Sequence, residues 1–160
     1  MSDEKRLAII ATKGSLDWAY PPFILASTAA ALGYETQIFF TFYGLQLLRK
    51  RLALEVTPLG NPGMPMPMGM DKWFPVLGTA LPGMQSVMTM MMKKKMKDKG
   101  VASIEELREL CQEAEVKLIA CQMTVDLFDM NPTEFIDGVE YAGAAAFFEF
   151  AGESDICLYI

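Results

Sequence analysis

The 160-residue sequence contains three cysteines and no histidine. Without histidine, neither a Ser-His-Asp triad nor a Cys-His dyad can form, and most zinc and haem sites lose their usual ligand. Any chemistry must therefore come from cysteine, carboxylate, lysine or backbone groups. An odd number of cysteines in a chain long enough to bury a full core predicts reduced thiols rather than a disulfide framework.

Cys121 stands where a thiol could become reactive. It follows an apolar run at residues 116–120, which is typical of a buried strand, and it precedes a predicted helix start near Thr124. Amide groups at a helix N-terminus stabilise a thiolate and lower its pKa. Asp126 in the same turn would oppose this effect, whereas Lys13, at the end of the first predicted strand, would support it. These residues alone leave packing and reaction both open.

The other two cysteines are predicted to pack. Cys111 lies on the apolar face of a helix whose start is marked by a capping box of Ser103 and Glu106. Cys157 lies within a last apolar strand, between two aliphatic residues. A small buried hydrophobe is the expected role for both side chains.

Strands and helices alternate along the chain, which predicts an α/β fold with an open, mostly parallel sheet and helices on both faces. A fifth strand could lie around the Met-rich region, and residues 132–154 are expected to form a turn and then a helix. In such sheets the site lies at the carboxyl ends of the strands, where Cys121 stands. The predicted strands are residues 6–12, 36–42, 116–121 and 155–160, and the helices are a segment ending near residue 33 and residues 44–52, 82–97 and 103–115.

The chain is expected to form a single domain over residues 1–160, with a loop rich in Met, Pro and Gly at about 59–75. Thioether groups bind Cu(I), and methionine also suits adaptable apolar surfaces. An alternative function is therefore a non-catalytic oligomeric interaction module, with an inert Cys121 and a loop that binds a partner, a membrane or Cu(I). The alternating methionines of this loop are Met64, Met66, Met68 and Met70.

A net charge of −6 and a pI near 4.7 argue against nucleic-acid binding. Residues 76–92 carry no charge, but their prolines and polar side chains make a poor membrane span. The helix predicted at 82–97 is instead expected to be buried or to lie in an oligomer interface. The first residues lack the pattern of a secretory signal, which together with the reduced thiols predicts a cytoplasmic protein.

Longer motifs resemble the DsrE/DsrF-like family, in the branch often labelled "peroxiredoxin family protein", over essentially the whole chain. The motifs are "LAIIATKGSLDWAYPPFILASTAAALGYETQIFFTFYGLQLL", "GMPMPMGM", "SIEELRELCQE" and "LIACQMTVDLFDM". This resemblance implies a flavodoxin-like fold, a homo-oligomer without a cofactor, and a role in cytoplasmic sulfur trafficking. Relatives carry sulfane sulfur as a cysteine persulfide and exchange it with TusA-like sulfur carriers and rhodanese-like donors. The sulfur-bearing cysteine of the family corresponds to Cys121.

The expected function is therefore that of a sulfur carrier resembling a sulfurtransferase, with Cys121 as the catalytic residue. Residues 116–120 lack the proline, threonine and arginine of a peroxidatic site, so no peroxidase activity is expected. No metal site is expected. The residues predicted to bind or support the transferred sulfur are Lys13, Gly14, Ser15, Gln122, Met123 and Thr124.

Overall fold

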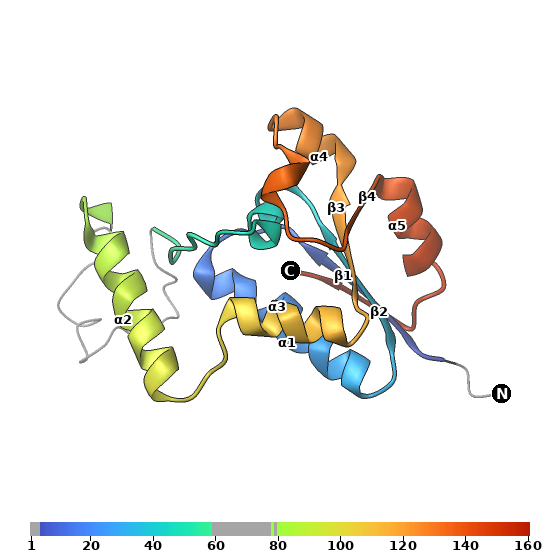
Figure 1. Ribbon diagram of the computed structural model, residues 1–160, viewed down its shortest axis with the longest axis horizontal. Helices are drawn as coiled ribbons and strands as arrows, with labels where there is room; N and C mark the ends of the chain where they lie inside the picture. Colours follow the sequence, from blue (N-terminus) through green and yellow to red (C-terminus); the bar gives the residue numbers. More distant parts are fainter. Residues whose placement is uncertain (1–3, 59–77, 79) are drawn as a thin grey trace. The chain divides into compact units, whose positions relative to one another are not determined.

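The computed structural model describes residues 4–58, 78 and 80–160 (Figure 1). The Met-rich loop predicted at 59–75, with its four alternating methionines, lies outside the described residues. The elements are, in chain order, β1 (Arg6–Ala11), α1 (Leu16–Ala31), β2 (Glu35–Phe40), the 3-10 helix η1 (Phe42–Leu48), α2 (Met84–Asp98), α3 (Ile104–Glu113), β3 (Lys117–Cys121), α4 (Gln122–Leu127), the 3-10 helix η4 (Pro132–Glu134), β4 (Val139–Ala142), α5 (Ala144–Ala151) and β5 (Ile156–Tyr159).

The strands form one five-stranded sheet in the order β4-β3-β2-β1-β5, and every neighbouring pair is parallel. Successive residues of a strand point to opposite faces. On one face the Phe40 ring lies 5.9 Å from that of Phe23 in α1, and on the other the Phe39 ring lies 5.2 Å from that of Phe147 in α5. Helices therefore cover both faces, and the predicted flavodoxin-like α/β architecture is confirmed.

The described chain divides into two compact units. Of the described residues, the first unit comprises 4–14, 18–52 and 103–160 and contains the whole sheet. The second comprises 15–17, 53–58, 78 and 80–102 and contains α2. Within the second unit, the Thr57 backbone N–H donates a 3.0 Å hydrogen bond to the Asp17 carboxylate. The Val56 backbone N–H donates a 3.0 Å hydrogen bond to the Thr89 hydroxyl. The single-domain organisation stays a prediction.

The fifth strand, β4, lies where a turn and a helix were predicted. Residues 139–142 pair with β3, and α5 begins only at Ala144, after Gly143. The described part of the Met-rich region holds α2 instead of a strand. The sequence analysis did not predict β4 because β4 is short and lies at the edge of the sheet. A four-residue strand that pairs on one side shows too little alternation to stand out in a sequence.

The predicted helix at 82–97 exists as α2; it is mostly exposed in the described chain, and its alternative place in an oligomer interface stays a prediction. Among the described residues of this helix, Thr89 is the buried one, and Val87, Met90 and Met91 are exposed. The lysines from Lys93 onward interrupt the apolar residues, so α2 has no continuous stripe to bury. None of the helices described here is both long enough and apolar enough to cross a membrane.

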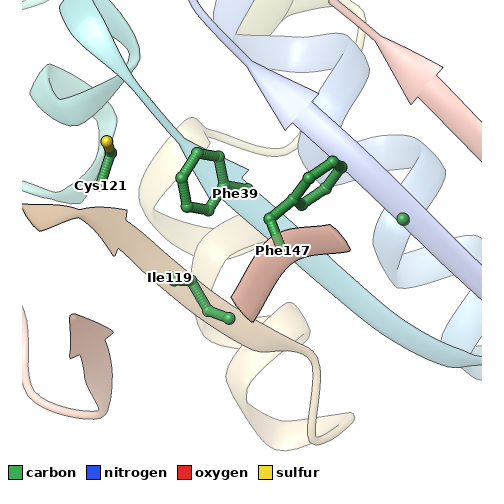
Figure 2. Close-up of a cluster of buried hydrophobic side chains, with 5 residues drawn as sticks. Phe39, Ile119, Cys121 and Phe147 are labelled. Atoms are coloured by element: carbon green, nitrogen blue, oxygen red, sulfur yellow. The ribbon is translucent and has the colours of Figure 1, made fainter. Parts of the chain in front are cut away.

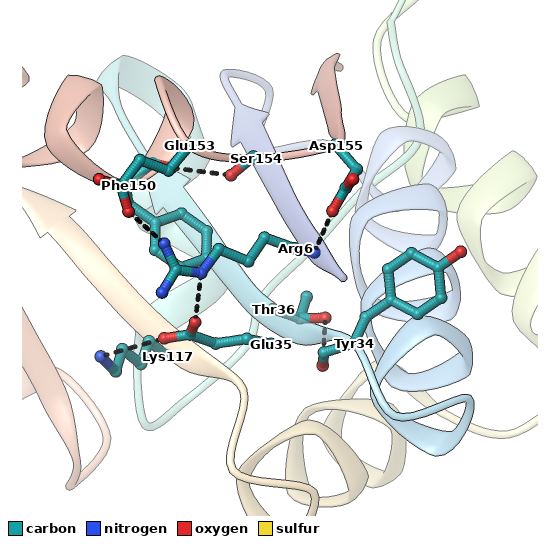
Figure 3. Close-up of polar contacts among 9 residues, drawn as sticks. All are labelled: Arg6, Tyr34, Glu35, Thr36, Lys117, Phe150, Glu153, Ser154 and Asp155. Carbon is teal, nitrogen blue, oxygen red and sulfur yellow. Dashed lines mark hydrogen bonds and ion pairs between the residues drawn. The ribbon is translucent and has the colours of Figure 1, made fainter. Parts of the chain in front are cut away.

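An ion-pair network joins the amino ends of the strands, opposite to the edge at which Cys121 lies (Figure 3). The Arg6 guanidinium contacts Glu35 of β2 at 2.7 Å and also Glu153. Glu35 in turn lies 3.9 Å from Nζ of Lys117 in β3, and Asp155 accepts a 2.8 Å hydrogen bond from the Arg6 N–H. The network thereby links β1, β2 and β3 with the turn that leads into β5.

Phe147 is the main contact of α5 with the sheet, because it is 4% exposed and packs with Phe39 and Ile119. We expect Phe147→Ala to lower the free energy of unfolding by about 3–5 kcal/mol, as measured by urea denaturation. The matched control is Phe148→Ala, whose side chain is 69% exposed and should cost less than about 1 kcal/mol. Equal losses in the two variants would contradict this account of the core.

Candidate functional site

Cys121 ends β3 and is the N-cap residue of α4, so it stands at the carboxyl edge of the sheet. Cys121 is 5% exposed and belongs to the buried cluster that includes Phe39, Ile119 and Phe147. Figure 2 shows Cys121 at the tip of β3, to one side of the two phenylalanine rings. The thiol therefore has an apolar surface behind it and the start of a helix in front.

Two threonine hydroxyls form the polar side of this site. The Oγ1 atoms of Thr41 and Thr124 lie 3.2 Å apart, and both hydroxyls act to lower the pKa of the Cys121 thiol. Thr124 is fully buried in the first turn of α4, and Thr41 directly follows β2, the strand beside β3. The two hydroxyls therefore reach the sulfur from two neighbouring segments.

Opposing influences set the pKa of Cys121. Burial is the largest single one and raises the pKa, because it disfavours the charged thiolate. The hydrogen bonds act the other way: the side chain and N–H of Thr124, the Thr41 hydroxyl and the Met123 N–H together bring the pKa below its ordinary value. The thiolate is therefore more populated at neutral pH than in an ordinary cysteine, and the thiolate is the nucleophile.

The backbone around η1 fixes the position of Thr41. Phe42 has a positive φ of 48°, a conformation that is unfavourable for a bulky side chain, and its N–H donates a 3.3 Å hydrogen bond to Oγ1 of Thr124. Any Cβ at Gly44 would overlap the carbonyl oxygen of Ala11, so glycine permits this close approach. The Thr124 oxygen thus accepts from the Phe42 N–H and also lies within hydrogen-bond distance of the Thr41 hydroxyl.

Of the six predicted supporting residues, Met123 and Thr124 are the ones that act to lower the pKa of Cys121. Gln122 is exposed, and its side-chain amide donates a 2.7 Å hydrogen bond to Asp126. Support of the transferred sulfur by Gln122 therefore stays a prediction.

The predicted residues after β1 have other contacts. The Lys13 ammonium lies 3.1 Å from the centre of the Trp18 ring, and a Cβ at Gly14 would overlap the carbonyl oxygen of Tyr43. Ser15 belongs to the second unit, where its hydroxyl lies 3.2 Å from that of Thr57. Lys13 and Gly14 are not among the groups that shift the pKa of Cys121. The structure thus gives Gly14 a packing role and Lys13 a cation–π contact.

The two remaining cysteines differ from each other. Cys111 is completely buried in α3 as predicted, its Sγ lies 3.5 Å from the Phe23 carbonyl oxygen, and burial raises its pKa to about 11. Cys157, in contrast, is exposed, so its predicted packing role is wrong. It lies in the edge strand β5, which pairs with β1 on one side, and this position leaves its side chain at the surface.

Thr41 is the residue of the site that sequence reasoning missed. Its position directly after β2 was a usable signal, because carboxyl ends of parallel strands meet at one edge of a sheet. Within the described ranges, no group of three or more Cys, Asp and Glu side chains is placed to hold a metal ion. The methionines considered for Cu(I) lie outside those ranges.

These features define a class of protein: a parallel α/β sheet with one activated cysteine at a strand end. Residues 3–159 match the model of the DsrE/DsrF/DrsH-like family, and the chain belongs to this family. It is 88% identical over 158 residues to the protein named "Sulfur carrier protein DsrE2" of Allochromatium vinosum, with 99% of each chain covered.

A more distant relative is the protein named "Uncharacterized protein YrkE" of Bacillus subtilis, which is 36% identical over 162 residues, with 98% of this chain and 97% of that protein covered. Among solved structures, the ychN protein from E. coli matches with a TM-score of 0.55 and 12% identity, over 98% of this chain and 99% of that one. At this identity the match shows a shared fold alone.

The hydroxyl of Thr124 should be needed for the low pKa of Cys121. In Thr124→Val, which keeps the side-chain shape, we expect the pKa of Cys121 to rise, because the thiolate loses a charge-assisted hydrogen bond. Alkylation of Cys121 by iodoacetamide at neutral pH should slow about threefold to tenfold. The rate is measured by peptide mass mapping across a pH series. Thr133→Val, at an exposed position in η4, is the control and should leave the profile unchanged. An unaltered profile in Thr124→Val would contradict the assignment.

Proposed function

We propose that the protein is a sulfur carrier that holds sulfane sulfur as a persulfide on Cys121 and passes it to a partner thiol. The observation that carries this proposal is the position of Cys121, buried at the end of β3 and at the start of α4, where Thr41, Thr124 and Met123 act to lower the pKa of its thiol. It supplies, without histidine, the activated nucleophile that sulfur transfer needs. Membership of the DsrE/DsrF/DrsH-like family and the name of the relative from Allochromatium vinosum support the same function.

The transfer consists of two exchange steps. In the first, the Cys121 thiolate attacks the outer sulfur of a donor persulfide, a new S–S bond forms, the S–S bond of the donor breaks, and the donor leaves as a thiolate. In the second, an acceptor thiolate attacks the outer sulfur on Cys121, and the Cys121 thiolate is released. No external oxidant or reductant is consumed. The hydroxyls of Thr41 and Thr124 stabilise the anion at the start of the first step and at the end of the second.

The donor in this proposal is a rhodanese-like protein, and the acceptor is a TusA-like sulfur carrier. The proposed location is the cytoplasm. The three free cysteines support this location, since an exposed thiol such as that of Cys157 remains reduced in a compartment that maintains thiols.

Intact mass measurement after incubation with a polysulfide donor tests the persulfide. We expect the Cys157→Ser protein to gain the mass of one sulfur atom, which dithiothreitol removes, and the Cys121→Ser/Cys157→Ser protein to gain none. Cys111 should not take the sulfur, because its thiol is buried and its pKa is raised to about 11. Loading that persists without Cys121, or no loading of a protein that retains it, would refute the proposal.

We further propose that the protein is a homo-oligomer and that α1 contributes to the interface. The chain carries no charged residue between Asp17 and Glu35. Ile24 and Leu25 of α1 are 42% and 41% exposed, and Leu32, directly after the helix, is 73% exposed. A helix that is apolar on its outer face is usually covered by another surface. Because an isologous contact places identical surfaces together, an uncharged face suits a chain with a net charge of −6.

The oligomer should dissociate when a charge is placed on this face. We expect Leu32→Glu to lower the mass measured by analytical ultracentrifugation, because it would bring like charges together in a symmetric contact. Met90→Glu, on the exposed surface of α2, is the matched control. A monomeric wild type would contradict the oligomer, and dissociation by Met90→Glu alone would move the interface from α1 to α2.

A further inference from the structure

Three exposed aromatic rings lie together on the segments that follow β2 and β3. The ring of Phe128 lies 6.2 Å from that of Phe42, edge to face, and 6.0 Å from that of Tyr43, stacked. Phe42, Tyr43 and Phe128 are 45%, 65% and 41% exposed, and we call these three residues the aromatic rim. Phe42 and Tyr43 follow Thr41 directly, and Phe128 is the C-cap of α4, whose N-cap is Cys121. The rim is thus built from the two segments that hold the thiolate.

Helix α4 adds further apolar surface beside the rim. Met123 is 61% exposed and Leu127 is 59% exposed, although both lie within three residues of buried Thr124 or Val125. A group of large apolar side chains left at the surface marks a site that another molecule covers. Such clusters with aromatic residues are typical of the energetically important part of protein interfaces.

The charge on these segments indicates the sign of the partner. Asp126 and Asp129, on α4 and in the turn that follows it, are both exposed. A second copy of the chain would bring these carboxylates against each other in an isologous contact. A surface with lysine or arginine beside apolar side chains complements them.

On the basis of the proposed sulfur transfer, we infer that the aromatic rim with Asp126 and Asp129 is the docking surface for a basic thiol protein. The partner presents a cysteine flanked by apolar side chains and by Lys or Arg, which bring its sulfur to Cys121. Small anionic thiols lack these groups, meet like charge at the site and are disfavoured. The surface thereby selects which thiols exchange sulfur with Cys121.

Thiol–disulfide exchange tests this docking without requiring a persulfide. Two synthetic peptides carry one cysteine as a mixed disulfide with thiopyridine, flanked by leucines and by either lysines or glutamates. The Cys121 thiolate attacks the peptide sulfur, a protein–peptide disulfide forms, and thiopyridone leaves and is followed by its absorbance. All proteins carry Cys157→Ser, so that the exposed thiol does not contribute. A free neutral thiol, N-acetylcysteine amide, gives the intrinsic ratio of the two peptides.

The ratio of the rate with the lysine peptide to the rate with the glutamate peptide should be about fivefold higher for the parent protein than for the free thiol. Exposed charge contacts at low salt allow an effect of this size. In Asp126→Asn/Asp129→Asn this preference should fall to the intrinsic ratio, as it should at high salt. Tyr43→Ala should slow the reaction of Cys121 with the lysine peptide and leave the rate of its reaction with dipyridyl disulfide unchanged. Tyr159→Ala, at a 75% exposed tyrosine in β5, is its control.

A parent protein that shows only the intrinsic ratio would overturn the inference, and so would a preference that survives the double Asn substitution. Tyr43→Ala could instead change the oligomeric state in sedimentation and leave the peptide rates unchanged. The rim would then be covered by a second copy of the chain, and this result would also overturn the inference. Because Cys121 reacts here as a free thiolate, these outcomes do not depend on persulfide loading. Failure of the docking surface and failure of sulfur carriage are thereby distinguished.

Discussion

The hydrogen bonds of the Thr124 hydroxyl are the interaction on which the site depends. This buried group accepts from the Phe42 N–H, lies 3.2 Å from the Thr41 hydroxyl and acts to lower the pKa of the Cys121 thiol. It therefore joins the segment after β2 to the start of α4 and stabilises the thiolate at the same time. The unfavourable φ of Phe42 and the glycine at position 44 both serve this junction. Removal of the hydroxyl would leave the Phe42 N–H without its acceptor.

Cys111 and Cys121 show how one fold gives two thiols different properties. Both are buried, and in both the largest influence raises the pKa. Cys111 lies on the inner face of α3, where its neighbours are mostly apolar and one hydrogen bond favours the thiolate. Cys121 lies at a strand end, where the hydroxyls of Thr41 and Thr124 and the backbone of Met123 and Thr124 favour it. Burial alone therefore does not set the direction of a thiol pKa shift; the polar groups around the sulfur also contribute.

The sequence was sufficient to predict the parallel α/β sheet and the place of Cys121, since both follow from local patterns. It was not sufficient for the neighbours of Cys121, because they depend on the strand order. The prediction placed Lys13 and Gly14, after β1, beside the thiol. In the structure β2 lies between β1 and β3, so Thr41 takes the place beside Cys121. The same limit explains Cys157, because an apolar strand pattern does not reveal that the strand lies at an edge.

The pairing of β5 with β1 also constrains how the chain reaches its native state. Residues 156–159 pair in parallel with residues 7–10, so this contact closes a loop that contains nearly every other element. Contacts of such high sequence separation form slowly, because the entropy of loop closure opposes them. During synthesis the outer edge of β1 therefore stays open after the site around β3 has been made. Until the last strand emerges, the outer edge of β1 is unpaired and apolar. The nascent chain can associate with other chains through this edge unless it is protected.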